Sequence, residues 1–263
     1  NLVRKALKET EQATKQQIAA ATGLSTVTVG TVLQHLISRN EAFEVELSSS
    51  SGGRPAHQFK YNSDYAYVLV LFPLETKEGI QVNSTVVNLL GEVVHQTTKK
   101  VSHINVAIFE HIIDDLLNSY PDIKAIGFGL PGAEYEGKVV VSDYQELLGV
   151  SLVEHFSHKY NRSVIMENDV NAAVIGYSKK ILNINEATVI YIYFPGSYPP
   201  GAGIFINGVL YKGKSNFAGE IANIPLGVDW NDKNLYSSMS HLSEGIAKLM
   251  IAASSLLNPS YVV

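Results

Sequence analysis

A cluster of polar residues follows a short strand-like stretch in the second half of the chain. Residues 164–166 (Val-Ile-Met) lead directly into Glu167, Asn168 and Asp169, and Asn171 follows. Polar side chains at the point where a strand ends and a helix begins occupy the usual ligand-binding edge of an open α/β sheet. In the plainer alternative, Asp169 and Asn171 only cap a helix that starts after Glu167. The junction is therefore a candidate binding site.

A second group of polar residues lies near the N-terminus, in a segment that has the pattern of two short helices. A capping box at Thr14 and Gln17 begins a short helix that stops at Gly23, and Ser25 caps the next predicted helix. Two short helices joined at a glycine, the second with small polar residues near its start, form the geometry that enters a DNA major groove. The residues of this helix predicted to face DNA are Ser25, Thr26, Thr28, Thr31, Gln34 and His35.

Two alternating stretches after these helices predict a β-wing. Residues 43–47 and 57–61 alternate in apolar character around Ser-Ser-Ser-Ser-Gly-Gly-Arg-Pro at 48–55. Arg54 at the tip is expected to contact a phosphate or a narrow minor groove. Because the reading helix has no Arg or Lys between Ser25 and Ser38, we expect one module to bind DNA weakly and a dimer to be required. The alternative is a module of the same shape that contacts another protein.

The rest of the chain has the pattern of an α/β domain. Strand-like stretches lie at 65–74, 82–90, 123–128, 164–166 and 188–194, with helical patterns at 106–117 and 242–257. A second capping box is predicted at Ser151 and Glu154. Asn207-Gly208 is the strongest hairpin signal in the chain. Residues 129–132 (Gly-Leu-Pro-Gly) predict a backbone turn where side chains would obstruct a ligand or a neighbouring segment.

Composition excludes several classes of protein. The 263 residues are 46% hydrophobic and 17% charged, which indicates a globular rather than a disordered chain. The absence of cysteine excludes disulfides, thiolate metal sites and cysteine nucleophiles, and it fits a reducing compartment, so we expect a cytoplasmic protein. There is no apolar run of about 20 residues to span a membrane, and no signal segment opens the sequence.

The net charge of −5 is distributed unevenly along the chain. Residues 1–62 hold seven Lys and Arg against five Glu, a balance of +2, whereas the remainder holds 13 basic against 20 acidic residues, a balance of −7. A mildly basic N-terminal segment followed by an acidic remainder indicates that the N-terminal segment binds a polyanion. Chance variation in a short window is the alternative.

Five motifs occur in an order that is specific for one family. They are Ser-Gly-Gly-Arg-Pro at 51–55, Ile-Gly-Phe-Gly-Leu-Pro-Gly at 126–132, Glu-Asn-Asp-Val-Asn-Ala-Ala at 167–173, Gly-Ala-Gly-Ile-Phe-Ile-Asn-Gly-Val-Leu-Tyr-Lys-Gly at 201–213 and Ala-Gly-Glu-Ile at 218–221. Together they resemble the ROK family of repressors, open reading frames and sugar kinases, in its regulator form. The resemblance implies a winged helix-turn-helix before an actin-like (ribonuclease H-like) two-lobed domain. It also implies a sugar or sugar phosphate as ligand, a double-stranded DNA operator and a homodimer or higher homo-oligomer.

The same resemblance implies roles for individual residues. Asn168 and Asp169 match the family's contacts to sugar hydroxyls, and in its kinases the aspartate acts as general base. Glu220 matches a second sugar contact, and Asn223 stands where the family has a histidine. A carboxylate beside an amide supplies the paired acceptors and donors that a sugar needs. For Glu220 the alternative is a solvated glutamate at the start of a helix.

Two segments depart from the pattern of the family's kinases. The phosphate turn between the first two strands corresponds to residues 72–79, which hold one glycine, a proline and two glutamates. The second phosphate loop corresponds to residues 194–201, where three prolines remove amide donors. The family's cysteine-rich zinc loop is missing, because the chain has no cysteine. We therefore expect no phosphoryl transfer, no cofactor and no bound metal.

These observations predict a non-catalytic, sugar-responsive transcriptional repressor of carbohydrate metabolism. The expected domains are a DNA-binding domain at 1–62, a first lobe at 63–166 and a second lobe at 167–263. We expect the second lobe to be incomplete, because the sequence stops within the strand-like residues Tyr261–Val263. The runner-up is an active ROK-type carbohydrate kinase with an accessory DNA-binding domain. In a third interpretation the cleft binds no ligand and serves only for dimerisation.

Overall fold

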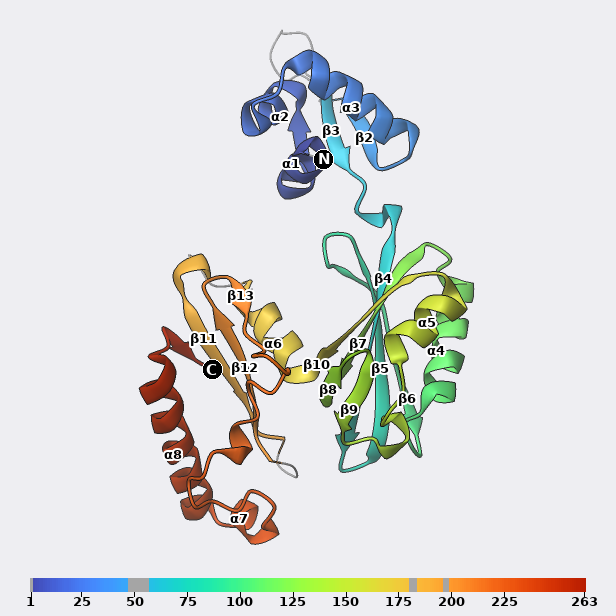
Figure 1. Cartoon of the computed structure of the whole chain (residues 1–263). Coiled ribbons are helices and arrows are strands. Elements are labelled where there is room, and N and C mark those ends of the chain that lie inside the picture. Colours follow the sequence, from blue (N-terminus) through green and yellow to red (C-terminus); the bar gives the residue numbers. More distant parts are fainter. Residues whose placement is uncertain (1, 47–56, 180–183, 196–198) are drawn as a thin grey trace. The chain divides into compact units, whose positions relative to one another are not determined.

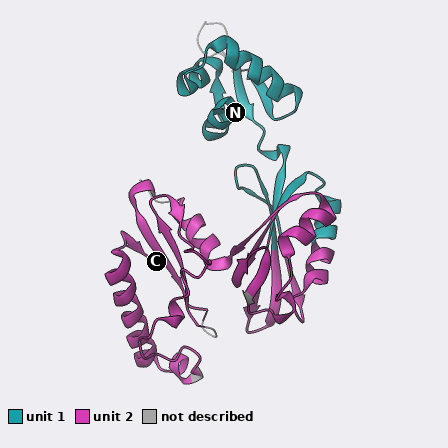
Figure 2. Ribbon diagram, in the orientation of Figure 1, with its two compact units in different colours: residues 1–70, 84–97, 113–125 teal, residues 71–83, 98–112, 126–263 magenta. Residues whose placement is uncertain are grey.

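The computed structural model describes residues 2–46, 57–179, 184–195 and 199–263 (Figure 1). The chain forms two compact units, one made of residues 1–70, 84–97 and 113–125, and the other of residues 71–83, 98–112 and 126–263 (Figure 2). Arg54 and the rest of the predicted wing tip lie outside the described residues, as do residues 196–198 of the segment that corresponds to the second phosphate loop.

The N-terminal part consists of three helices and a small antiparallel sheet. The elements are α1 (Leu2–Thr10), β1 (Gln12–Thr14), α2 (Lys15–Thr22), α3 (Thr26–Ser38), β2 (Ala42–Glu46) and β3 (His57–Tyr61), with strand order β1-β3-β2. The predicted capping box at Thr14 and Gln17 is confirmed. Gly23 ends α2 with a φ of 70°, and Ser25 Oγ accepts the backbone amide of Thr28 at 3.1 Å to begin α3. Strand β1 was not predicted from the sequence, because its three residues depend on hydrogen bonds to the distant strand β3.

The helices of this part share one apolar core with β3. Val29, Leu33 and Leu36 of α3 are buried, as predicted for that face, beside Leu7 of α1 and Phe59 of β3. A helix that buries one face in this way presents the opposite face to solvent. The small polar residues of α3 are therefore left on the surface.

A buried carboxylate fixes the end of α3. Glu41 is 4% exposed, and its carboxylate binds Arg4 at 2.6 Å and Arg39 at 2.9 Å. The backbone amide of Asn62 donates to the Glu41 carbonyl at 3.1 Å, and the Asn62 side chain donates to the Asn40 carbonyl at 2.7 Å. Paired in this way, the buried charge ties the start of α1, the end of α3 and the connection after β3 together.

The largest sheet has five strands in the order β10-β7-β4-β5-β6. Their bounds are β4 (Tyr67–Thr76), β5 (Gly79–Asn88), β6 (Val93–Val101), β7 (Ile123–Leu130) and β10 (Ser163–Asn168). Two helices, α4 (Val106–Ser119) and α5 (Leu152–Tyr160), pack against β7 through Phe109, Phe128 and Phe156, whose ring centroids lie 5.0–6.4 Å apart. The second predicted capping box is wrong. Ser151 begins α5 with a ψ of 73° instead of an extended backbone, and its side chain makes no capping hydrogen bond.

A hairpin that the sequence pattern did not predict lies between β7 and β10. It consists of β8 (Gly132–Tyr135) and β9 (Lys138–Ser142), with Glu136 and Gly137 at the turn, both with positive φ. The sequence predicted a turn over residues 129–132. In the structure β7 ends at Leu130 and β8 starts at Gly132, so only Pro131 lies between the two strands. The hairpin places the segment after Ser142 beside the end of β4, which matters for the site.

The second sheet has four strands in the order β13-β12-β11-β14. They are β11 (Thr188–Tyr193), β12 (Gly201–Ile206), β13 (Val209–Leu210) and β14 (Tyr261–Val262), flanked by α6 (Asp169–Ser178) and α8 (Met239–Leu257). The predicted hairpin at Asn207-Gly208 is confirmed, with φ values of 50° and 83°. Val189 packs in the core that includes Val174 of α6, whereas its neighbour Ile190 packs with Leu249 of α8. Successive residues of β11 thus bury a helix on each face of the sheet.

The remaining short elements are η1 (Ser63–Tyr65), η2 (Gln145–Leu147), η3 (Ile184–Glu186), η4 (Ile221–Asn223) and α7 (Lys233–Ser237). Within the part of the chain that the structure describes, no helix has the length and apolar character needed to cross a membrane.

Candidate functional site

The junction between β10 and α6 holds the polar residues singled out in the sequence. Asn168 caps α6, because its Oδ1 accepts the backbone amides of Val170 and Asn171, each at 3.0 Å. Its Nδ2 donates to the Gly132 carbonyl at 3.1 Å, which leaves the second amide hydrogen for a ligand. Asp169 accepts the backbone amide of Val170 at 2.9 Å through one oxygen. Helix capping, weighed above for Asp169 and Asn171, is thus the role of Asn168 and partly of Asp169.

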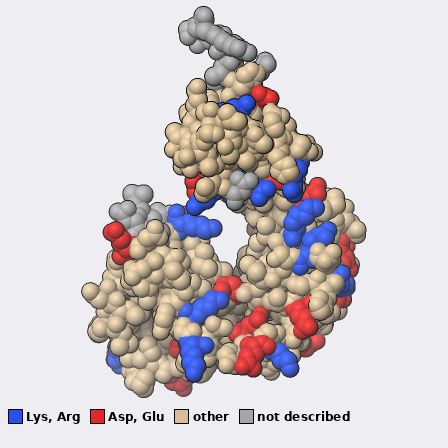
Figure 3. All heavy atoms as spheres, turned by 45° about the horizontal axis from the view of Figure 1, so that its top comes forward, with Lys and Arg blue, Asp and Glu red and all other residues tan. Residues whose placement is uncertain are grey.

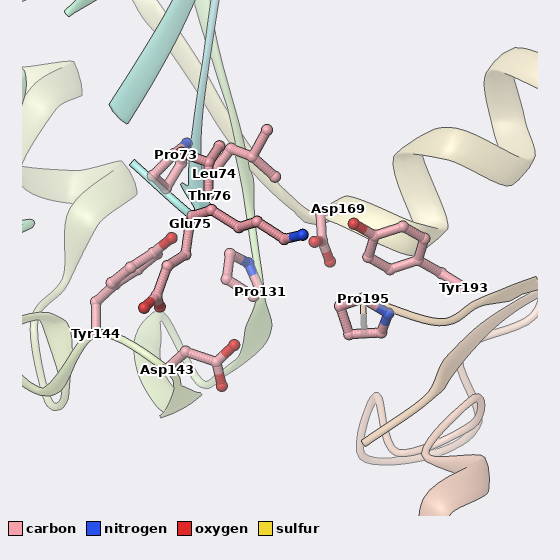
Figure 4. A pocket seen from close by; sticks show the side chains of 11 residues that line it. Pro73, Leu74, Glu75, Thr76, Pro131, Asp143, Tyr144, Asp169, Tyr193 and Pro195 are labelled. Carbon is pink, nitrogen blue, oxygen red and sulfur yellow. The ribbon is translucent and has the colours of Figure 1, made fainter. Parts of the chain in front are cut away.

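A cavity of about 410 Å³, here called the main cavity, opens in front of Asp169. Figure 4 shows the side chains of Glu75, Asp143 and Asp169 around the same space. Glu75 comes from the end of β4, Asp143 from the segment after β9 and Asp169 from the start of α6. The full lining consists of Pro73, Leu74, Glu75, Thr76, Lys77, Pro131, Asp143, Tyr144, Asp169, Tyr193 and Pro195. The cavity is thus rich in acceptors and in prolines, and Lys77 is the one basic residue among the described residues that line it.

Three carboxyl groups at or near this cavity, those of Asp143, Asp169 and Glu220, have a raised pKa. Burial raises the pKa of Asp143, and the charge of Glu75 raises it further. Burial is also the main cause of the raised pKa of Asp169, to which the charge of Asp143 adds. The pKa of Glu220 is raised by burial and by the charges of Asp143 and Asp169. Asp143, Asp169 and Glu220 therefore share one electrostatic environment that disfavours negative charge.

Removing one of these charges is expected to stabilise the unliganded protein at neutral and alkaline pH. A raised folded-state pKa means that the stabilising contribution of Asp143 is full below its ordinary pKa and is lost as the pH rises through the raised value. Asp143→Asn is therefore expected to raise the thermal midpoint by about 2–4 °C at about pH 8, with a smaller gain at about pH 4. Thermal unfolding over a pH series checks this, with Asp114→Asn on α4 as the matched control. A gain that is equal at every pH would contradict it.

A smaller pocket of about 30 Å³ adjoins this junction and holds Glu220. Its lining includes Gly132, Asn168, Asn171, Asn216, Gly219 and Glu220. Asn168, Asp169 and Glu220, predicted as one site, are therefore close together. Asn223 lies apart from them: its exposed side chain donates to the Glu220 carbonyl at 3.3 Å and lines neither the main cavity nor this smaller pocket.

Several residues of the site were not identified from the sequence. Glu75 was considered only as a charge in a lost phosphate turn, and nothing in the sequence singles out Asp143. Glu167 accepts the backbone amide of Asn168 at 3.0 Å and the side-chain amide of Asn171 at 3.2 Å, and it pairs with Lys212 at 2.5 Å. The motif at 167–173 could have suggested Asn171 as a contact, but it was weighed only as a helix cap.

The segment that corresponds to the first phosphate turn is mostly extended strand. Residues 72–76 belong to β4, and a two-residue turn at Lys77 and Glu78 leads into β5 at Gly79. Pro73, Pro131 and Pro195 line the main cavity, and proline has no backbone N–H to offer a phosphate. Among the described residues, no group of three or more His, Asp or Glu side chains is arranged to hold a metal ion.

The second candidate site is the exposed face of α3. Its exposed residues include Ser25 at the cap and Thr26, Thr28, Thr31, Gln34 and His35, all predicted to face DNA. Val27 is 77% exposed among them and was not predicted; an apolar group there suits contact with a thymine methyl. In the view of Figure 3 the surface of the N-terminal part is mostly uncharged. The exposed face of α3 therefore carries mostly small polar side chains, and α3 itself has no Arg or Lys.

Comparisons with known proteins bear on both sites. A model of the ROK family matches residues 78–241. The xylose repressor of Bacillus subtilis (strain 168) is 25% identical over 229 residues, which cover 82% of this chain and 57% of the repressor. The chain thus spans less than three fifths of the length of that relative.

Two solved structures share the fold. A ROK family transcriptional regulator, described as a homologue of the E. coli MLC protein, superposes with a TM-score of 0.67 at 17% identity, over 95% of this chain and 67% of that one. A candidate N-acetylmannosamine kinase from Listeria monocytogenes superposes with a TM-score of 0.60 at 15% identity, over 74% of this chain and 81% of that one.

Proposed function

Because the chain belongs to the ROK family, we propose that it is a sugar-responsive transcriptional repressor of carbohydrate metabolism and not a sugar kinase. The observation that carries this proposal is the alignment of 82% of the chain with a xylose repressor. Among the sugars, xylose is accordingly the first effector to test. The site of action of such a repressor is the cytoplasm.

The N-terminal part is proposed as a winged helix-turn-helix, residues 1–62, with α3 as its reading helix. The superposition on a ROK regulator supports this, because coverage of 95% of the chain must include most of these residues. In the same proposal residues 63–166 and 167–263 form the two lobes of the sugar-binding domain. Ser25, Thr26, Thr28, Thr31, Gln34, His35 and Arg54 contact the operator.

The mechanism follows from two sites on one chain. A homodimer places two reading helices on two half-sites, and Asn168, Asp169 and Glu220 contact a sugar in the main cavity and the smaller pocket beside it. A sugar that binds better to one arrangement of the protein shifts the population of dimers that match the operator spacing. Repression then depends on the concentration of the sugar.

The lining of the main cavity supports a regulator over a kinase. Phosphoryl transfer depends on positioned contacts to phosphates and magnesium, and this lining offers three carboxylates, three prolines and one lysine instead. Asp169, which matches the kinases' general base, then binds a hydroxyl without deprotonating it for attack. Kinase activity is nevertheless the second candidate, because the ROK kinase fold and Asp169 are both present.

Mobility-shift titration with DNA from upstream of the chain's own operon tests the proposal. The expected result is a specific complex that D-xylose or another sugar weakens by about tenfold or more. A coupled assay of ADP release over the same sugars is expected to show no turnover. Turnover that Asp169→Asn abolishes would establish the kinase instead, and the lack of any specific DNA complex would reject the repressor. A DNA complex that no sugar alters, with no thermal shift by any sugar, would favour the dimerisation scaffold.

A further inference from the structure

We infer that the effector is an unphosphorylated sugar whose hydroxyls donate to Asp143, Asp169, Glu220 and Asn171, and that the site rejects the same sugar once it is phosphorylated. This inference rests on the proposed function, since it names the ligand class of the same site. It adds two contacts, Asp143 and Asn171, that the sequence did not suggest.

The first argument is the charge of the site. Glu75, Asp143 and Asp169 line the main cavity, and Glu220 is close enough for its pKa to respond to two of them. Within the part of the chain that the structure describes, Lys77 is the one basic residue in that lining. A phosphate group carries up to two negative charges, so each carboxylate repels it, and the repulsion is strongest in a partly desolvated cavity.

The second argument is that the described part of the lining is poor in the donors that phosphate sites use. Sites for phosphate use backbone N–H groups of glycine-rich turns or helix N-termini, usually with Arg or Lys. Here Pro73, Pro131 and Pro195 stand in the lining without an N–H. At the start of α6 the amides of Val170 and Asn171 already donate to Asn168 and Asp169. These two amides of the helix N-terminus are therefore not free to bind a phosphate.

The third argument is a buried acceptor that lacks a donor. Asn171 is 7% exposed and lines the smaller pocket, and its Oδ1 has no partner among the described residues. The Nδ2 of Asn171 donates to the Glu167 carboxylate at 3.2 Å, and Glu167 forms an ion pair with Lys212. These contacts fix the orientation of the Asn171 amide, so its oxygen and nitrogen cannot exchange places. An unpaired buried acceptor is costly, and it is satisfied by a hydroxyl that donates into the pocket.

Together these features match the chemistry of a polyol. Three carboxylates and one amide oxygen are all acceptors, and a sugar presents several hydroxyl donors at fixed spacing without a net charge. A carboxylate that accepts from a hydroxyl forms a strong, short hydrogen bond, so affinity does not require a charged ligand. A ligand without hydroxyls leaves the acceptors of the site unpaired and therefore binds weakly. A ligand that carries phosphate is repelled by the carboxylates.

Calorimetric titration of the full chain with D-xylose and D-xylose 5-phosphate tests the ligand class. D-Xylose is expected to bind at least about tenfold more tightly than its phosphate. The double variant Glu75→Gln, Asp143→Asn is expected to raise the relative affinity for the phosphate by about tenfold, an effect that added salt reduces. Equal or tighter binding of the phosphate would overturn the inference.

Asn171→Ala tests the buried acceptor, with Asn118→Ala on the exposed face of α4 as the control. The variant is expected to weaken D-xylose binding by about tenfold, whereas Asn118→Ala is expected to bind D-xylose and operator DNA like the wild type. Among monodeoxy xyloses, the one that lacks the donating hydroxyl is expected to bind wild type and Asn171→Ala equally. If every deoxy sugar still discriminates between them, or if sugar affinity is unchanged, Asn171 holds only a buried water and the assignment fails.

The two levels of failure can be told apart by the DNA assay. If a phosphorylated sugar binds and releases the operator, the repressor stands and the ligand class inferred here is wrong. If neither xylose nor any sugar or sugar phosphate of the panel binds, while the DNA complex forms, the inference and sugar sensing both fail. If no specific DNA complex forms although D-xylose binds as expected, the ligand class stands and the repressor fails.

Discussion

Replacement of Thr31 by glutamate on α3 is expected to weaken operator binding by about 100-fold. Thr31 lies on the exposed face of the helix, and no Arg or Lys of α3 can neutralise a new carboxylate beside the DNA. In a dimer the change occurs twice. Each copy costs about 1.4 kcal/mol of binding free energy, which is about tenfold in affinity, and the two tenfold factors multiply to about 100-fold. The helix itself should persist, since glutamate is a good helix former at an exposed position.

Fluorescence anisotropy with labelled operator DNA measures this effect, and circular dichroism verifies that the variant is folded. Asn118→Glu, which adds the same charge to the exposed face of α4, is the matched control and is expected to bind DNA almost normally. Normal binding by Thr31→Glu would mean that α3 does not face DNA. The N-terminal part would then have the role of a protein-contact module, the alternative weighed from its sequence.

Replacement of Gly219 by alanine is expected to destabilise the protein by about 3 kcal/mol and to abolish sugar binding. Gly219 has a φ of 105°, and a Cβ placed on it would lie 2.0 Å from the Ala202 carbonyl oxygen. The contact is between two backbones, so no side chain can move aside to relieve it. The backbone amide of Ala202 also donates to the Gly219 carbonyl at 2.8 Å, so a shift would break this link and displace Glu220.

A glycine with nearly the same backbone serves as the control for this prediction. Gly79 has a φ of 106°, and a Cβ there would meet no atom within 4 Å. Gly79→Ala therefore reports the backbone strain alone, expected at about 1 kcal/mol, and the difference between the two variants is the cost of the clash. Denaturant unfolding and calorimetric sugar titration measure both. Equal stability of the two variants would show that the loop at 213–220 moves away from β12 without cost.

Features that depend on neighbours in the sequence were predicted correctly. Thr14 and Gln17 cap each other within one helical turn, and Gly23 adopts the left-handed conformation that ends α2. The Asn207-Gly208 turn needs only its own two backbone conformations. Ser151 shows the limit of this reasoning, because it has the right type and spacing but a backbone that turns its hydroxyl away.

The binding site itself was predicted only in part. Asn168, Asp169 and Glu220 were identified by resemblance to the family, and the structure brings them together around adjoining pockets. Asp143 was not identified because it reaches the main cavity through the unpredicted hairpin β8–β9. Glu75 was not identified because β4 ends at Thr76, two residues later than predicted. Asn168 also caps the helix, a role that was considered from the sequence for Asp169 and Asn171, and Asn171 offers a free acceptor.

The sequence by itself determined the family, the α/β class, the helix caps and the exposed polar face of α3. Each of these depends on the order of motifs or on hydrogen bonds between residues a few positions apart. Only the tertiary structure decided which carboxylates share the cavity and which amide lacks a partner. Glu75, Asp143 and Glu220 are far apart along the chain. The interaction between their charges, and the burial of Asp143 and Glu220, arise only when the strands and loops that carry them are packed together.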